Sequence, residues 1–388
     1  MRIHNLGIRI GQGRPGPLNS ITDVSGVRVG HATVVCDYAG QSVRTGVTVI
    51  EPRPGSARLS PCYAGCHVLN GNGDATGLEW VRESGLLTTP IAYTNTHSVG
   101  IVRDALVKAE RASVGTSRYW CMPVVLETFD GVLNDIWGQH VTAAHVREAL
   151  EDAKGGPVAE GGVGGGTGMI CHEFKGGIGT ASRVLDAADG GWTVGAIVQA
   201  NYGRRDALRV AGYPVGEVLR DVPSPFAQSE RGEPGMGSIV VTLATDAPLL
   251  PHQCTQLARR AGIGLARVGG GTEYSSGDIF LAFSVGNDGM PPADYSSRSA
   301  LLTAVQSVNQ DFMTSLFVAA ADAVEEAILN ALVAAVDTDG QGVNVQSIGI
   351  DRLLDALRKT GWRRDPARDQ GASVRRRFLK SSRRPQEI

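Results

Sequence analysis

The chemistry with the clearest basis in the sequence lies at the junction of Gly237 and Ser238. Residues 219–237 combine prolines, glycines and charges without periodicity, which indicates an exposed loop. Residues 238–244 (SIVVTLA) are apolar and rich in β-branched residues, which is typical of a buried strand. The Ser238 hydroxyl could attack the carbonyl of Gly237, whose lack of a side chain offers the least steric resistance. Cleavage would give Ser238 a free α-amine with a pKa of roughly 7.7–8.0, suited to act as general base for its own hydroxyl.

A Gly-Ser pair before a strand is common, so this junction alone does not establish self-cleavage. A second candidate is the sequence EYSSGD at residues 273–278, where Ser275 or Ser276 beside Asp278 could orient a nucleophile. The alternative for this stretch is a turn before a strand at residues 278–285, with Asp278 as its cap. The pattern leaves both interpretations open.

The histidines and cysteines give weaker signals. His140 and His145 lie near the start of a predicted helix without an obvious serine and acid partner, so the sequence does not assemble a Ser-His-Asp triad. Cys62 and Cys66, followed by His67, have no second pair at zinc-site spacing, and buried thiols are the favoured interpretation. We therefore expect neither a metal nor another cofactor.

Glycine is the compositional outlier, with 51 residues among 388, about 13% against a typical ~7%. Three strings stand out, at Gly162–Gly168, residues 176–182 and residues 269–272. None of them has the lysine and hydroxyl residue of a P-loop or the spacing of a dinucleotide-binding fingerprint. Structural turns and backbone contacts to an oxyanion or substrate are the two interpretations left open.

The elements that must position these residues alternate between helices and strands. Apolar spacing of helical period predicts helices at residues 101–113, 141–153, 249–262 and 313–336. Short, β-rich apolar runs predict strands at residues 193–200, 238–244 and 278–285. Residues 21–35 mix valine and threonine with turn residues and predict a strand pair. This order favours a layered α/β or α+β domain.

Composition and charge restrict the class of protein. The formal net charge of −2 argues against a nucleic-acid-binding protein, and neither a signal peptide nor a run of about 18 apolar residues appears, so we expect no membrane partner. Six scattered cysteines in a chain of this size are expected in a reducing cytoplasm. Residues 362–388 carry nine Lys or Arg against three acids. We expect a basic, disordered tail there, with anion or nucleic-acid binding as the alternative.

Seven long strings, in the correct order, resemble the DmpA-like family of aminopeptidases, which includes the β-peptidyl aminopeptidases. The resemblance spans roughly residues 1–336. The strings are GPLNSITDVSGVRVGH (16–31), LNGNGDATGLEWVRESGLLTTPIAYTNTHSVG (69–100), LETFDGVLNDIWGQHV (126–141), EGGVGGGTGMICHEFKGGIGTASRV (160–184), VQANYGRR (198–205), GSIVVTLATDAPLLPHQC (237–254) and SSGDIFLAFS (275–284).

The resemblance implies a four-layer αββα sandwich, similar to N-terminal-nucleophile hydrolases but with different connectivity. Residues 1–361 would form one self-processing domain, cut after Gly237 into pieces 1–237 and 238–361 and followed by the tail 362–388. Members of the family assemble as tetramers of such cleaved pairs, so the resemblance implies a homo-oligomer.

The roles of the family carry over to individual positions of this sequence. Ser238 matches the nucleophile that becomes acylated, and Ser276 and Asp278 match a serine and an acidic residue proposed to position and polarise it. Asn201, in QANYG, matches an asparagine that donates to the oxyanion, and Glu127, in ETFDG, matches a carboxylate that pairs with the free amino group of the substrate. An acylated N-terminus would leave Glu127 buried and unpaired, which costs several kcal/mol and favours exopeptidase action.

One departure from the family concerns the oxyanion hole. The family can present a tyrosine hydroxyl two residues after the glutamate, whereas this sequence has Phe129, and nearby Val132 supplies no hydroxyl either. A missing donor could weaken turnover or change the preferred substrate, unless a backbone amide takes its place.

The expected function is therefore that of a cytoplasmic aminopeptidase, which releases N-terminal residues, D- or β-residues included, from small peptides, amides or esters through an acyl-enzyme on Ser238. One alternative is an acyltransferase of the same fold, although that group uses a threonine nucleophile. The other is a non-catalytic scaffold or binding relative.

Overall fold

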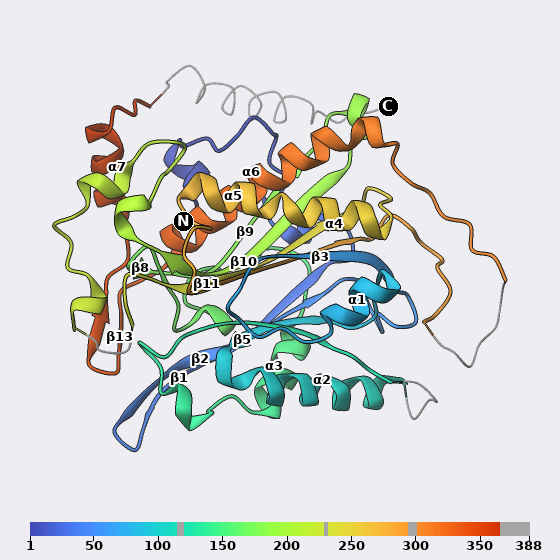
Figure 1. The fold of residues 1–388 in the computed structure, drawn as a ribbon, viewed down its shortest axis with the longest axis horizontal. Helices are drawn as coiled ribbons and strands as arrows, with labels where there is room; N and C mark the ends of the chain where they lie inside the picture. The colour runs from blue at the N-terminus through green and yellow to red at the C-terminus, as the bar shows by residue number, and fades with distance from the viewer. Residues whose placement is uncertain (115–119, 229–231, 294–300, 365–388) are drawn as a thin grey trace, which may run out of the picture.

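The computed structural model describes residues 1–114, 120–228, 232–293 and 301–364. Two sheets lie face to face between two layers of helices (Figure 1), which confirms the expected αββα sandwich. One helix layer contains α4 (Pro251–Arg259), α5 (Ala261–Val268) and α6 (Met313–Ala334), and the other contains α2 (Val99–Val114) and α3 (Ala143–Asp152). No helix in the described ranges is long and apolar enough to cross a membrane.

The six-stranded sheet has the order β4-β3-β12-β11-β10-β9. Its strands are Leu86–Leu87 (β4), Cys62–Gly71 (β3), Ser276–Ser284 (β12), Gly235–Thr245 (β11), Thr193–Gly203 (β10) and Gly177–Val184 (β9). The four-stranded sheet has the order β1-β2-β5-β6, with strands Arg28–Tyr38, Gln41–Glu51, Ile91–Asn95 and Val124–Thr128. At the centre of the larger sheet, β11 runs parallel to β12 and antiparallel to β10.

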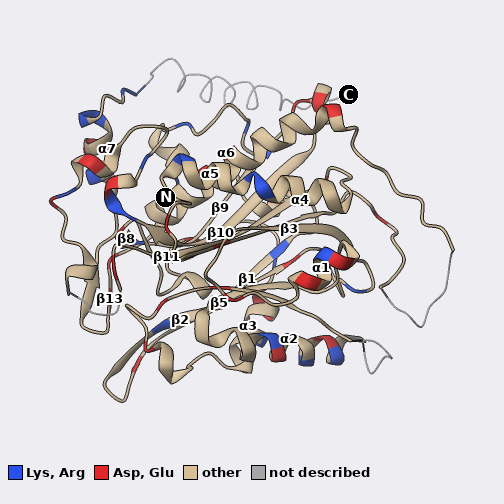
Figure 2. Ribbon diagram, in the orientation of Figure 1, with Lys and Arg blue, Asp and Glu red and all other residues tan. Residues whose placement is uncertain are grey.

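Apolar burial on both faces explains why the strands of the larger sheet read as continuous hydrophobic runs. In β11, Val240 packs into the core between the two sheets, and Val241 packs into the core under the helices. Ile328 and Leu332 of α6 belong to the helix-side core. Figure 2 shows that charged residues are sparse on the central strands and more frequent on helices such as α2.

The shorter elements lie around this sandwich. Helix α1 (Leu78–Ser84) follows β3, and α7 (Ile350–Lys359) ends the described chain. Two small hairpins pair β7 with β8 and β13 with β14. Their strands are Ile170–Cys171, Phe174–Lys175, Thr338–Gly340 and Val343–Val345.

Most elements predicted from apolar patterns are confirmed within a few residues, although 249–262 forms two helices, α4 and α5. The strand pair predicted at residues 21–35 is wrong. Residues Ile21–Asp23 form a 3-10 turn, and β1 begins at Arg28 and pairs with β2 over a two-residue turn. Ser20 caps the 3-10 turn through its hydroxyl, so a local side-chain contact prevails over the β-branched composition.

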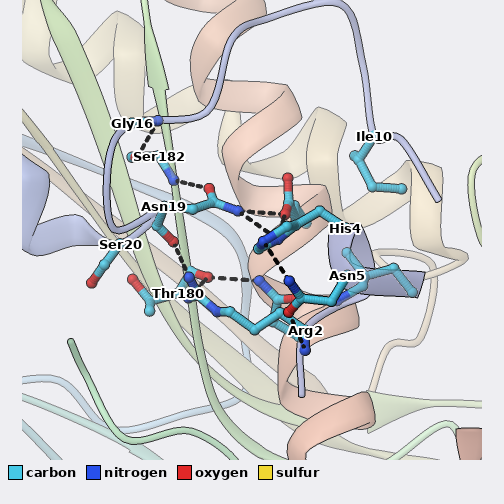
Figure 3. A network of polar contacts seen from close by, with 12 residues as sticks. Arg2, His4, Asn5, Ile10, Gly16, Asn19, Ser20, Thr180 and Ser182 are labelled. Carbon is cyan, nitrogen blue, oxygen red and sulfur yellow. Dashed lines mark hydrogen bonds and ion pairs between the residues drawn. The ribbon is translucent and has the colours of Figure 1, made fainter. Parts of the chain in front are cut away.

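The N-terminal segment is fastened to β9 and α6 by a polar network (Figure 3). Arg2 forms an ion pair with Glu160 at 2.7 Å. Asn19 accepts the backbone N–H of Ser182 at 2.9 Å and donates to Glu326 of α6 at 2.6 Å. These contacts connect the beginning of the chain to its last third. The assignment of residues 1–361 to a single domain stays a prediction. The predicted basic tail at residues 362–388 lies mostly beyond residue 364, outside the described residues.

Candidate active site

Ser238 is the fourth residue of β11, so the structure corrects the sequence-based placement of a strand beginning at Ser238. The strand starts at Gly235 because this residue already pairs with Gly203 of β10. Ser238 has Asn201 of β10 as its partner on one side and Gly277 of β12 on the other. The Ser238 side chain is only 4% exposed, and its Oγ accepts the N–H of Gly277 at 3.0 Å. The backbone of a neighbouring strand therefore fixes the hydroxyl.

Gly237 occupies a position that only glycine fits. Its φ is +129°, a conformation that side chains strongly disfavour. A Cβ added at this residue would lie 1.8 Å from the backbone oxygen of Asn201. The glycine therefore allows β11 to approach β10 closely, which is a stronger requirement than the low steric resistance inferred from the sequence.

A cleft of about 530 Å³ brings together four of the predicted site residues, Ser238, Glu127, Phe129 and Gly237, and the candidate Ser275. Its lining comes from both sheets and includes Gly237, Thr96 and Phe129. The larger sheet thus supplies the serine hydroxyl, and the smaller sheet supplies the carboxylate. A second cavity, of about 640 Å³, lies between the N-terminal segment and the outer helices and contains none of the predicted site residues.

Glu127 lies at the end of β6 and is 3% exposed. Its Oε1 accepts the N–H of Asp74 at 2.8 Å, and its Oε2 accepts the hydroxyl of Thr96 at 2.5 Å. Burial raises the pKa of Glu127, and these two hydrogen bonds oppose the shift. No Lys or Arg within the described ranges forms an ion pair with it. Sequence analysis missed Asp74 and Thr96, because both lie far from Glu127 along the chain.

Ser276 and Asp278 form a hydrogen-bonded pair on the opposite face of the sheet from the Ser238 side chain. Side chains alternate along β12, and Gly277 is the partner of Ser238, so both neighbours of Gly277 point away from the cleft. Ser276 Oγ donates to Asp278 Oδ1 at 2.5 Å. In the part of the chain that the structure describes, neither side chain forms a hydrogen bond with Ser238 Oγ. The pair lies beside the backbone of Ser238.

The carboxyl group of Asp278 also contacts the start of the nucleophile strand. Asp278 is the cross-strand partner of Ile239, the residue after Ser238. Burial raises the pKa of Asp278, and the hydrogen bonds from Ser276 and Ile239 act in the opposite direction. Among the described residues, Asp278 Oδ2 is buried without a hydrogen-bond partner.

The amide of Asn201 is oriented by two backbone groups. Its Oδ1 accepts the N–H of Ile170 at 2.7 Å, and its Nδ2 donates to the carbonyl of Phe129 at 2.8 Å. A backbone N–H only donates and a carbonyl only accepts, so these partners determine which end of the amide is nitrogen. Nδ2 also lies 3.1 Å from the place of a Cβ on Gly237. Its second N–H is therefore next to the residue that precedes Ser238.

Phe129 and Val132 line a small apolar pocket beside Asn201, together with Phe226 and Met236. Phe129 contributes its backbone carbonyl to the orientation of Asn201, and its ring contributes no hydrogen-bond donor. The Nδ2 group of Asn201, unlike the ring of Phe129, can thus donate a hydrogen bond next to Gly237.

The glycine string Gly162–Gly168 serves the fold. The N–H of Gly164 donates to Thr33 Oγ1 at 2.8 Å, and that of Gly165 donates to Thr48 Oγ1 at 3.1 Å. A Cβ on Gly165 would lie 2.2 Å from Gln199 Oε1. The string passes close to both sheets and uses these amides internally, which favours the structural interpretation over oxyanion binding.

The other candidates from the sequence lie outside the cleft. His140 Nε2 contacts Asp135 at 2.9 Å, an acid partner that the sequence analysis had not identified. Cys62 and Cys66 are buried in the core between the sheets, and burial raises the pKa of Cys62 to about 12. The described residues contain no group of three or more His, Cys, Asp or Glu side chains placed to hold a metal ion.

Residues 19–345 match peptidase family S58. The chain belongs to this family. It is 45% identical to the β-peptidyl aminopeptidase BapA of Sphingosinicella microcystinivorans over 372 residues. The aligned region covers 92% of each protein. A solved β-aminopeptidase from a Burkholderia species is 70% identical, with a TM-score of 0.90 over 94% of this chain and 100% of that one.

A second solved relative indicates the catalytic class. It is the L-aminopeptidase D-Ala-esterase/amidase of Ochrobactrum anthropi, a prototype for the serine aminopeptidases and a variant of the N-terminal-nucleophile hydrolase fold. It is 45% identical, with a TM-score of 0.85 over 93% of this chain and 99% of that one. The chain is thus a serine aminopeptidase with the N-terminal-nucleophile hydrolase fold, as the resemblance implied.

Replacing Gly237 should destabilise the chain far more than replacing a glycine that has only an unusual φ. Gly55 has a φ of +82° and no atom within 4 Å of an added Cβ, so Gly55→Ala should cost about 1–2 kcal/mol. Gly237→Ala adds the collision with Asn201 and should cost at least about 4 kcal/mol. Urea unfolding of both variants is measured in a Ser238→Ala background, so that no cleavage through the Ser238 hydroxyl can affect the comparison. Equal destabilisation by the two changes would contradict the close approach of β10 and β11.

Proposed function

We propose that this chain cleaves itself between Gly237 and Ser238 and then uses Ser238 to remove N-terminal residues from small peptides, amides or esters. The observation that carries the proposal is the shared cleft, in which the Ser238 hydroxyl and the Glu127 carboxylate face one space of about 530 Å³. A hydroxyl nucleophile and an amine-binding carboxylate in one cleft are the minimum that an aminopeptidase without a metal requires.

Self-cleavage follows from the groups around Gly237. Ser238 Oγ attacks the carbonyl carbon of Gly237, and negative charge develops on the carbonyl oxygen. This oxygen can accept a hydrogen bond from the second N–H of Asn201 Nδ2. The C–N bond breaks as the nitrogen of Ser238 takes up the proton lost by Oγ, which leaves an ester. Water then hydrolyses this ester and releases the carboxylate of Gly237 and the amine of Ser238.

Turnover uses the same groups in a second round. The new α-amine takes the proton of Ser238 Oγ, Oγ attacks the substrate carbonyl, and the ammonium returns the proton to the leaving amine. Water attack on the resulting ester releases the N-terminal residue. The α-amine starts from the strand position beside Asp278, so its ammonium form can pair with the unpartnered Oδ2, while Ser276 holds the other oxygen. Removal of an oxyanion donor such as Asn201 typically costs ~2.7–4 kcal/mol.

Glu127 gives the enzyme its exopeptidase character. Its oxygens are already held by Thr96 and Asp74, so the carboxylate has one orientation toward the cleft. A free ammonium of the substrate neutralises this buried charge, whereas an acylated N-terminus cannot. The β-aminopeptidase relatives support N-terminal β-amino acids as the substrate class.

The assembly and location of the enzyme are part of the proposal. We infer a tetramer of cleaved pairs from the resemblance to the family. None of the six cysteines, all of which lie in the described ranges, forms a disulfide, and this supports a reducing cytoplasm.

Intact mass under denaturing conditions tests self-cleavage. The 40.7 kDa chain of 388 residues, divided in proportion into 237 and 151 residues, gives pieces of about 25 and 16 kDa. The wild-type protein should show both pieces, and Ser238→Ala only the full length. A wild-type protein that stays at full length would overturn the proposal, because the α-amine base would never form.

Glu127→Gln should remove the preference for substrates with a free amine. We expect kcat/KM for a free-amine substrate to fall about 100- to 1,000-fold, since a buried ion pair is lost. In the wild type, kcat/KM should fall as the pH drops through the raised pKa of Glu127, and this loss should be absent in the variant. The acid limb that survives in the variant reports protonation of the Ser238 α-amine, the general base of the proposed mechanism, and of Asp278, whose pKa burial also raises.

The matched control for this substitution is Glu79→Gln, because Glu79 lies on the surface of α1 with its side chain 90% exposed. It should leave kcat/KM unchanged. Equal cleavage of free and N-acetylated substrates by the wild type would contradict the role of Glu127.

A further inference from the structure

Lys175, in β8, is a fully buried lysine that the proposed mechanism does not use. Its Nζ donates to three backbone carbonyls, those of Gly166 at 3.1 Å, Met169 at 3.0 Å and Gly176 at 2.9 Å. An ammonium has three N–H groups and no acceptor, so it matches three carbonyls, whereas a neutral amine has only two N–H groups to donate. The Met169 carbonyl also accepts the N–H of Gly176 at 2.8 Å. This geometry favours the charged form of Lys175 and opposes burial, which lowers the pKa of Lys175 to about 7.

Burying this charge is unfavourable, and the surroundings compensate only in part. Burial lowers the pKa of Lys175, and the nearby Asp130 and Cys171 oppose the shift from a distance. Within the described ranges no acidic side chain forms an ion pair with Lys175. An apolar residue of similar volume would avoid this cost, so the position of the charge requires an explanation.

One of the three carbonyls connects Lys175 to the oxyanion donor. The Met169 carbonyl and the Ile170 N–H belong to the same peptide unit, and no peptide bond in the described chain is cis, so the two groups point in opposite directions. Lys175 binds the oxygen end of this unit at 3.0 Å, and the nitrogen end donates to Asn201 Oδ1 at 2.7 Å. A single rigid peptide therefore links the ammonium to the Asn201 amide.

We propose that Lys175 is a positioning residue for the oxyanion hole, which acts through the Met169–Ile170 peptide to orient and polarise the amide of Asn201. A cation at the carbonyl end makes the peptide N–H a better donor, and hydrogen bonds in a chain strengthen one another. The amide then presents a more acidic N–H at Nδ2, where the oxyanion forms. This inference rests on the proposed role of Asn201.

Phe129 has no hydroxyl to donate to the oxyanion, so the proposed site depends on the orientation of the Asn201 amide. With the side-chain donor role on Asn201, its orientation and acidity determine how well the developing charge is stabilised. The Phe129 carbonyl fixes one N–H of Nδ2 at 2.8 Å, and the peptide held by Lys175 fixes the oxygen of the same amide. The second N–H has little freedom left.

The test compares Lys175→Met, Asn201→Ala and the double variant with the wild type. The substrate is the p-nitroanilide of an N-terminal β-amino acid, and rates are normalised to the cleaved fraction measured by intact mass. Lys175→Met should lower kcat about 10- to 100-fold with KM within about twofold, a smaller loss than the about 100- to 1,000-fold expected for removal of the donor itself. In the Asn201→Ala background, Lys175→Met should lower kcat by less than about twofold.

Two controls separate this role from a general loss of stability. Lys154→Met removes an exposed lysine paired with Asp152 and should leave kcat unchanged. Arg183→Met removes a buried cation that pairs with Glu326 on the helix side of β9, and it should lower the melting temperature without lowering kcat of the folded fraction. If Lys175→Met does not fold, Lys175→Gln takes its place, because it keeps polar donors but lacks the charge.

The possible outcomes distinguish the inference from the proposed function. An unchanged kcat in Lys175→Met, or its full defect in the Asn201→Ala background, would overturn the inference and leave the proposed function standing. An unchanged kcat in Asn201→Ala would overturn the oxyanion assignment and the inference together. A defect in Lys175→Met that disappears when Asn201 is absent supports the relay.

Discussion

The site depends on the register of three neighbouring strands, which places Asn201, Ser238 and Gly277 side by side on β10, β11 and β12. This register makes Gly277 the donor to Ser238 Oγ and brings the amide of Asn201 next to Gly237. A shift of one residue in β11 would turn the Ser238 side chain toward the helix layer and away from the cleft. The apolar burial of β11 on both faces, and the close approach that only Gly237 permits, hold the register.

The two sheets carry different groups of the proposed site. In the proposed mechanism, the larger sheet carries the nucleophile Ser238 and the oxyanion donor Asn201, and β6 of the smaller sheet carries Glu127. The distance between the sheets therefore sets the distance from the substrate amine to the carbonyl that is attacked. The core between the sheets, with residues such as Val240 and Leu126, maintains this spacing. Repacking this core is a physical route to a change in substrate length.

Apolar periodicity was sufficient to predict the main helices and strands, because burial on one or two faces decides their type. The junction at Gly237 and Ser238 also carried a local signal, whereas the roles of Asn201 and Glu127 came only through the resemblance to the family. Local signals could not reveal Lys175 or Thr96, since their partners lie on other elements and are brought together only by the tertiary register. The same reason explains why Asp278 proved to lie on the opposite face from the Ser238 side chain.

The central claim is that Ser238, once exposed at the start of its own chain, carries the acyl group. It is tested most directly by mixing the cleaved enzyme with an activated ester of a β-amino acid, quenching with acid and measuring the masses of both pieces. The account predicts that the acyl mass appears on the piece that begins at Ser238 and maps to that residue. An acyl group on any other residue, or full turnover by a Ser238→Ala chain, would contradict it.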